Sequence, residues 1–455
     1  MKILQITKKH PYGGGSGKIA ADLHEGYLNA GHFPVLAVAE PSTIIPHIIL
    51  SKGTSSSFLD EIVAPRVKFF LILFLKRSGL RTFKNLREWQ ARFTPKMDCL
   101  TKSFSEWRGI EYFGYRGIWD WIKSQTVYPD IIQGHTLEGD YFDLRSLSEL
   151  SRKSKVVLTL HNGWMLTGLC HHWLGCEKWK TGCGHCPVIH EHPQFGRDGS
   201  RENWKIKKEI YSKSRLYLST PCQWLMDHVD QSILQTAIVA RKVIYNGIDE
   251  VIFLPADRFL IRQKLNLPQD SLILLFVGNK TVSNKWKRTD WMFEAIQELS
   301  KFVLEKKITF VMLGQEGERS KIGNCDLFMV RHLNDPQQVA EYFQAADIYL
   351  HAALMDTFPN VVLEAMGCGL PVVATRVGGI SEQVLHGVNG FLSEPGNAKE
   401  MAGYLKQLIE SESLRMTMGL ASRKRVEDHF TKRKMVESYL KWFEEISGKA
   451  RANGQ

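Results

Sequence analysis

The sequence predicts an α/β protein of two domains, each built on a parallel sheet with helices on both faces. Its 455 residues are too many for one ordinary core, so two domains of about 200 residues each are expected. Hydrophobic residues make up 44% and charged residues 24% of the chain, which is the balance of a globular protein. Short apolar strands, glycine-containing loops and amphipathic helices alternate in both halves, which is typical of parallel sheets.

The first half supplies strands with glycine or histidine at their carboxyl ends. A strand at residues 3–6 leads into a glycine cluster, and a helix is expected over 19–30. Further strands are expected at residues 35–39, 130–133, 156–160 and 216–219. His135 and His161 follow two of them. Ligands of open parallel sheets collect beyond the carboxyl ends of strands, although a lone histidine there is equally compatible with a structural role.

The second half repeats this alternation after a turn at Asn246-Gly247, where we expect the domain boundary. Its strands are predicted at residues 272–277, 308–313, 348–350 and 372–375, with a helix near 291–304. From residue 398 onward the pattern is helical, and the last helix is expected at 432–446.

The segment 351–394 is the most informative for function. Asp356 and Glu364 flank the turn Phe358-Pro359-Asn360, and a helix is expected to start at Val361. The free N–H groups of a helix start attract phosphate, and a carboxylate one turn further in can accept hydrogen bonds from a ribose. The alternative is that Glu364 only supports the helix start electrostatically, an effect of about 0.3–1 kcal/mol.

The same segment, with its acid-x7-Glu spacing followed by EAMGCGLPVVAT and Gly378-Gly379, resembles the donor site of family-4 retaining glycosyltransferases of the GT-B fold. The resemblance implies two Rossmann-like doubly wound domains facing a central cleft. Residues 1–245 would bind the acceptor, residues 246–431 the nucleotide sugar, and a helix in 432–455 would pack back on the first domain. One departure is Asp356, where the family usually has glutamate.

The resemblance also implies the site residues. Catalytic roles fall to His161, Lys287, Asp356 and Glu364, and His135 and Asn162 lie on the acceptor side. Donor contacts fall to Gly14, Gly15, Gly278, Asn279, Lys287, Arg288, Phe358, Pro359, Asn360, Val361 and Glu364. Asn279 stands where the family commonly has arginine, so Lys280, Lys285 or Arg288 would have to supply that cation. The family transfers sugar on one face, with the leaving phosphate taking the acceptor proton and without a catalytic metal.

Four of the eight cysteines crowd into seventeen positions: Cys170, Cys176, Cys183 and Cys186. In a reducing compartment such crowding favours a metal, and four thiolates suit tetrahedral zinc, while two disulfides or an iron–sulfur cluster stay open. The run from His161 to Pro187 resembles a cysteine-bearing insertion of bacterial exopolysaccharide transferases, within residues 163–195. A closed four-ligand site is structural rather than catalytic, so we expect it to stiffen a loop.

The formal net charge of +11 suits an anionic partner without identifying it. Residues 61–100 are basic and contain an apolar run at 69–75, far shorter than the roughly 20 residues that span a bilayer. This segment suits either contact with an anionic membrane or a core helix with solvated ends. No cleavable leader is evident at the start, so we expect a cytoplasmic protein, with the inner face of the plasma membrane as the alternative location.

The sequence as a whole predicts a transferase that moves a sugar from a UDP- or GDP-sugar to a surface-polysaccharide or lipid-linked oligosaccharide acceptor. Alternatives are a nucleotide-sugar hydrolase or epimerase on the same fold, a related protein that binds sugar nucleotide without turnover, and a zinc-bearing nucleic-acid binder. The last is disfavoured because the basic segment lies apart from the cysteines, so we expect no nucleic acid partner.

Overall fold

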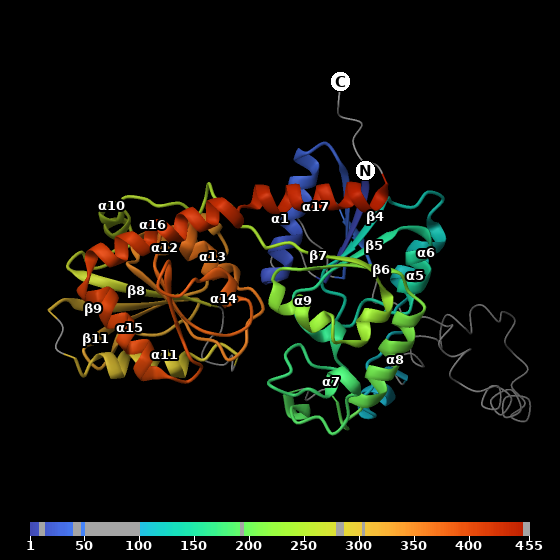
Figure 1. Ribbon diagram of the computed structural model, residues 1–455, viewed down its shortest axis with the longest axis horizontal. Coiled ribbons are helices and arrows are strands. Elements are labelled where there is room, and N and C mark those ends of the chain that lie inside the picture. The colour runs from blue at the N-terminus through green and yellow to red at the C-terminus, as the bar shows by residue number, and fades with distance from the viewer. Residues whose placement is uncertain are drawn as a thin grey trace, which may run out of the picture. The chain divides into compact units, whose positions relative to one another are not determined.

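The computed structural model of the protein describes residues 1–8, 14–39, 47–50, 101–191, 195–278, 286–302 and 305–448. The chain forms two compact units, each with its own parallel sheet (Figure 1). The expected α/β class with two doubly wound sheets is confirmed.

The sheet of the N-terminal half has seven strands in the order β3-β2-β1-β4-β5-β6-β7. The registered pairs from β3 through β5 are all parallel. Polar Gln5 and Gln133 lie side by side on β1 and β4, and the buried Gln133 side chain donates a hydrogen bond to Thr159 on β5. The strands are β1 (Lys2–Thr7), β2 (Phe33–Val38), β3 (His47–Ile49), β4 (Ile131–Gly134), β5 (Lys155–Thr159), β6 (Leu216–Thr220) and β7 (Ile238–Val243).

The second sheet has the order β10-β11-β9-β8-β12-β13-β14 and is parallel except for the hairpin of β10 and β11 at one edge. Every residue of the central strand β8 is buried, as expected of a strand covered on both faces. The strands are β8 (Ser271–Val277), β9 (Lys307–Leu313), β10 (Ser320–Ile322), β11 (Cys325–Val330), β12 (Ile348–His351), β13 (Val372–Thr375) and β14 (Gly390–Ser393).

Helices cover both sheets. In the N-terminal half they are α1 (Gly15–Asn29), α5 (Arg116–Ser124), α6 (Ser146–Lys153), α7 (Lys178–Thr181), α8 (Ser200–Ser212) and α9 (Gln223–Val229), with 3-10 turns η1 (Trp164–Leu166), η2 (Ile189–Glu191) and η3 (Ile233–Ala237). In the C-terminal half they are α10 (Arg258–Lys264), α11 (Thr289–Leu299), α12 (Pro336–Ala345), α13 (Asn360–Gly367), α14 (Ile380–Gln383), α15 (Ala398–Glu410), α16 (Glu412–His429) and α17 (Lys432–Ser447).

The last helix, α17, packs against the first, α1, with the rings of Tyr27 and Phe443 5.8 Å apart. For this reason the units do not follow chain order. The first comprises Met1–Gly13, His32–Leu218 and His228–Arg241, and the second Gly14–Gly31, Ser219–Asp227 and Lys242–Gln455. The predicted change of domain at residue 245 lies close to the last of these boundaries.

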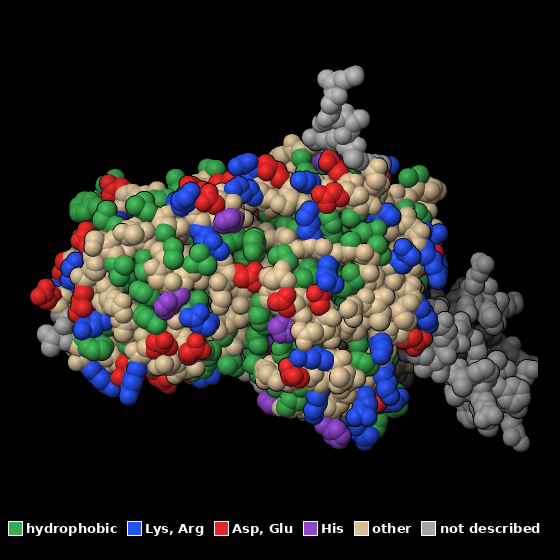
Figure 2. Space-filling model, viewed as in Figure 1, with side chains coloured by type: hydrophobic (Ala, Val, Ile, Leu, Met, Phe, Trp, Pro, Cys, Tyr) green, Lys and Arg blue, Asp and Glu red, His purple; other side chains and the backbone are tan. Residues whose placement is uncertain are grey.

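Two predicted features lie outside the described residues: the basic segment 61–100 and Asn279, together with Lys280 and Lys285. Within the part of the chain that is described, no helix has the length and apolar character to cross a membrane. On the face drawn in Figure 2, Lys and Arg side chains are interspersed with Asp and Glu, without a continuous basic stripe.

Candidate functional site

Helix α13 carries Glu364 at its centre. Pro359, with φ near −66°, fixes the entry of the chain, and no side chain caps the first N–H groups of the helix. Glu364 is only 5% exposed, and its Oε1 accepts a hydrogen bond from Lys18 Nζ at 2.6 Å. Burial alone would lower the pKa of Lys18, but Glu364, with Asp22 and Asp249, raises it. Lys18 is therefore a fixed cation beside the predicted ribose-binding carboxylate.

Helix α1 starts beside α13, within the same unit. Gly14 precedes it with φ of 80° and ψ of −164°, a conformation that is open essentially to glycine alone. Asn360 Nδ2 lies 3.4 Å from the Gly15 carbonyl oxygen, and Asn246 donates to Asn360 Oδ1 at 3.1 Å. The structure thus brings the predicted residues Gly14, Gly15, Asn360 and Glu364 together where two helices begin.

Asp356 faces His351, with 3.6 Å between Asp356 Oδ2 and His351 Nε2. Burial lowers the pKa of His351, and Lys287 lowers it further, while Asp356 opposes both. Lys287 is therefore close enough to act on this pair. The chain near it is anchored by a hydrogen bond from Leu354 N to Trp286 O of 2.8 Å.

The remaining predicted donor residues divide into two groups. Gly278, at the end of β8, donates to Leu313 O at 2.9 Å, and Val361 is partly exposed at the start of α13. Arg288, in contrast, is engaged with Asp290 at 2.8 Å and with the ring of Trp291.

The ring of Phe358 is 5% exposed and stacks on Tyr245, so its side chain packs inside the unit, and the donor contact at this position stays a prediction.

In the first unit, His135 and His161 follow β4 and β5. Their rings stack, and His135 Nδ1 lies 3.2 Å from His161 Nε2. Protein atoms packed around the ring lower the pKa of His161 to about 4, although part of the residue still reaches solvent. His161 is therefore neutral near pH 7 and acts as a hydrogen-bonding group rather than a charge.

Glu138, which sequence reasoning missed, completes the surroundings of Asn162. Asn162 Nδ2 donates to Glu138 Oε1 at 2.8 Å, and His171 Nε2 lies 3.9 Å from the same oxygen. Burial raises the pKa of Glu138, and the hydrogen bond from Asn162 opposes this. Its position four residues beyond the end of β4 was the available signal, because loops there face the ligand side of a parallel sheet.

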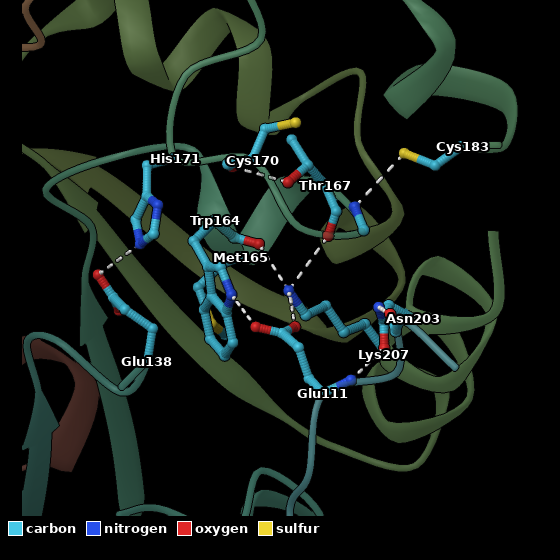
Figure 3. Close-up of polar contacts among 12 residues, drawn as sticks. Glu111, Glu138, Trp164, Met165, Thr167, Cys170, His171, Cys183, Asn203 and Lys207 are labelled. Atoms are coloured by element: carbon cyan, nitrogen blue, oxygen red, sulfur yellow. Dashed lines mark hydrogen bonds and ion pairs between the residues drawn. The ribbon is translucent and has the colours of Figure 1, made fainter. Parts of the chain in front are cut away.

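A buried ion pair lies beside Trp164 (Figure 3). Lys207 is fully buried, with Nζ 3.1 Å from Glu111 Oε2 and 3.6 Å from the centroid of the Trp164 ring. Glu111 also accepts a hydrogen bond from Trp164 Nε1 at 2.6 Å. Burial lowers the pKa of Lys207 and raises that of Glu111, while their mutual attraction opposes both shifts. Removing one partner would leave a buried charge, so the pair holds η1 in place.

The four predicted metal ligands, Cys170, Cys176, Cys183 and Cys186, are free thiols and line one cavity. Among the described residues, no three His, Cys, Asp or Glu side chains are already arranged around a common point as metal ligands are.

Comparison with known proteins identifies part of the chain. Residues 257–425 match the family described as Glycosyl transferases group 1. An N-acetyl-alpha-D-glucosaminyl L-malate synthase from Bacillus anthracis is 30% identical over 205 residues, 44% of this chain and 52% of that protein. A protein named as a colanic acid biosynthesis glycosyl transferase, WcaC, from Escherichia coli is 22% identical over 342 residues, 71% of this chain and 78% of its own. The chain spans about half the length of the first of these relatives.

Solved structures show the fold. A sucrose-phosphate synthase from Thermosynechococcus elongatus superposes with a TM-score of 0.63 at 17% identity, covering 99% of this chain and 100% of its own. HepE from Anabaena, solved in complex with UDP, gives 0.60 at 16% identity, covering 98% and 100%. The expected GT-B fold is confirmed, and residues 257–425 are a glycosyl transferases group 1 domain.

Proposed function

We propose that the protein is a retaining glycosyltransferase that takes its donor sugar from a nucleoside diphosphate. The observation that carries this proposal is the Lys18–Glu364 pair at the meeting point of α1 and α13. A diphosphate is favoured where uncapped N–H groups and an ammonium stand together, and the adjacent carboxylate accepts hydrogen bonds from ribose hydroxyls. The group 1 domain and the UDP bound in the HepE structure support this assignment.

The proposed reaction forms a bond between an acceptor oxygen and the anomeric carbon and breaks the bond from that carbon to the diphosphate. The acceptor proton passes to the leaving phosphate on the same face of the sugar, so configuration is retained. Charge that develops on the diphosphate is stabilised by Lys287 and the α13 N–H groups. Neutral His161 supplies a hydrogen bond to a sugar hydroxyl, and no catalytic metal takes part.

For the acceptor we propose a surface polysaccharide or a lipid-linked oligosaccharide. The likeness to the colanic acid protein supports this class, as does a capsular polysaccharide biosynthesis glycosyltransferase, CapM, from Staphylococcus aureus, 32% identical over 130 residues. A lipid-linked acceptor accords with the expected cytoplasmic location at the inner membrane face. Product analysis with and without acceptor separates transfer from the hydrolase or epimerase alternative.

A thermal-shift screen of UDP- and GDP-sugars tests donor binding. A ligand at 100 times its dissociation constant stabilises by about 2.7 kcal/mol. We expect Glu364→Gln to lose most of this shift because its amide cannot accept two ribose hydroxyls as a carboxylate does. Glu410→Gln is the control, since Glu410 is paired only with Lys406, at 3.6 Å, among the ion pairs described. A full shift in Glu364→Gln would contradict the proposed ribose contact.

A further inference from the structure

The cysteine segment surrounds a small, partly open cavity. Cys170, Cys176, Cys183 and Cys186 all line one cavity of about 20 Å³. A space of this size holds a single water-sized particle. Among the described residues, no histidine or carboxylate contributes to its lining, which otherwise includes Trp173, Trp179 and Lys178. Four sulfur donors around room for one atom suit one soft cation rather than an organic ligand.

A backbone N–H group near the cysteines donates a hydrogen bond to one of their sulfur atoms. Gly168 N donates to Cys183 Sγ at 3.4 Å. Amide donors of this kind stabilise negative charge on sulfur and orient it, which is how outer-shell groups support thiolate ligands.

The turns between the cysteines hold unusual backbone conformations. Gly175 and Gly184 have φ of 78° and 125°, and the non-glycine residues Leu174 and His185 have 45° and 49°. Such conformations persist only where the surroundings fix them. Here they occur in turns that reverse the direction of the chain, and Cys176 and Cys186 line the same cavity as Cys170 and Cys183.

We propose that the four cysteines bind one zinc ion as thiolates in a closed, tetrahedral, structural site. Because no three donors already meet at one point among the described side chains, binding requires thiol side chains to rotate toward the cavity. Four thiolates and a divalent ion carry a net charge of −2. Lys178, which lines the cavity, offsets part of this charge.

Hydrogen bonds connect the proposed zinc site to the segment that carries Asn162. Gly163 N donates to His171 O at 2.8 Å. Thr167 Oγ1 donates to Cys170 O at 2.8 Å (Figure 3). Lys207 Nζ holds the carbonyl oxygens of Trp164 and Thr167 at 3.0 and 3.3 Å. An ion on Cys170 and Cys183 would therefore fix both ends of the loop that contains η1.

The test is a metal count on tag-free, fully reduced wild-type protein after dialysis against a weak chelator. Elemental analysis is expected to give about one zinc per chain. Replacement by Co²⁺ is expected to produce the visible absorption bands of tetrahedral thiolate-bound cobalt, a readout that is independent of activity. Cys183→Ser and Cys186→Ser are expected to lose the metal and the bands, whereas Cys325→Ser, at a buried position of strand β11, is expected to keep both.

The wild-type measurements decide the proposal even if the cysteine variants do not fold. Reduced protein with no bound metal would overturn it. So would iron with acid-labile sulfide, or thiol titration of unreduced protein showing that these four cysteines form two disulfides. A cobalt spectrum of octahedral type would overturn the thiolate ligand set.

Discussion

Asp22 is an acid in an unfavourable position, one turn along α1 from Lys18. Its Oδ1 lies 3.6 Å from Lys432 Nζ, and its buried Oδ2 accepts no hydrogen bond within the described structure. Burial raises the pKa of Asp22 to about 6, and Lys18 and Lys432 only partly oppose this. Keeping the Asp22 carboxylate ionised in the folded protein therefore lowers the free energy of unfolding.

Removing the negative charge of Asp22 is therefore predicted to raise the free energy of unfolding by an amount that depends on pH. The pKa of Asp22 is higher in the folded protein than in the unfolded chain. The stabilising contribution of protonated Asp22 is therefore complete below about pH 4 and is lost as the pH rises through 6. Asp22→Asn is expected to be more stable than wild type at pH 7, by at most about 3 kcal/mol, and equal to it near pH 4. Urea unfolding at several pH values measures both.

The control is Asp270→Asn, whose carboxylate is exposed and paired with Lys307, which lowers its pKa. For this variant the sign is opposite: any difference is a loss of stability, and it grows as pH rises. A gain in Asp22→Asn that is the same at pH 4 and pH 7 would contradict the account of Asp22.

His161 predicts a different pH behaviour, in activity rather than stability. Because burial lowers its pKa to about 4, it stays neutral across the range in which the enzyme would be assayed. Loss of one neutral hydrogen bond costs about 0.5–1.5 kcal/mol, so His161→Gln is expected to lower kcat/KM up to about tenfold. The shape of the pH profile should not change between about pH 5.5 and 8, since no charge is removed. An acidic limb that disappears in the variant would show that His161 titrates in this range.

At the scale of elements, the start of α1 depends on one glycine. Gly14 has a backbone conformation that costs other residues about 1–3 kcal/mol, although its side-chain direction is open space. Gly14→Ala is therefore expected to destabilise the protein by that amount and to weaken UDP-sugar binding, because α1 begins beside Asn360. The matched control is Gly403→Ala in α15, also open, where alanine is expected to stabilise by about 0.4–1 kcal/mol. Chemical denaturation measures the change in stability, and a thermal-shift titration measures UDP-sugar binding. Equal changes in stability for Gly14→Ala and Gly403→Ala would contradict the role of Gly14.

Regular elements could be predicted from sequence because local patterns determine them. The strands expected at 272–277, 308–313 and 372–375 correspond to Ser271–Val277, Lys307–Leu313 and Val372–Thr375, each an apolar run between turn signals. The helix expected at 432–446 is Lys432–Ser447. The edge strand β10 was missed because its three residues include an exposed serine and lysine and have no apolar run.

Contacts between distant residues could not be predicted. Lys18 and Glu364 are 346 positions apart, and nothing near Lys18 indicates its partner. Glu111 and Lys207 likewise look like ordinary surface residues in sequence, yet Lys207 is fully buried. The stacking of Phe358 on Tyr245 could not be predicted for the same reason, because tertiary packing decides where its ring lies.

At the scale of the whole molecule, the second unit is assembled from three separate parts of the chain. Lys432 on α17 is 2.6 Å from Glu25 on α1, and Tyr439 on α17 is 3.0 Å from Ser219, in the segment 219–227. The unit that holds Glu364 therefore requires the first and last helices to pack together. Glycine allows the close approach, because a Cβ on Gly26 would lie 2.3 Å from Val436 Cγ2.

A double-mutant cycle tests whether this packing stabilises the unit. Gly26→Ala is expected to destabilise by about 1–3 kcal/mol, because Val436 is β-branched and cannot easily turn aside. In a Val436→Ala background the same change is expected to be much less destabilising, because the contacts with the two Val436 Cγ atoms are gone and only the Cβ, at 3.1 Å, remains close. Alanine also favours helix over glycine by about 1 kcal/mol. The coupling energy follows from four urea unfolding curves. If Gly26→Ala costs the same in both backgrounds, α1 and α17 do not pack through these residues in solution, and the position of Lys18 beside Glu364 loses its support.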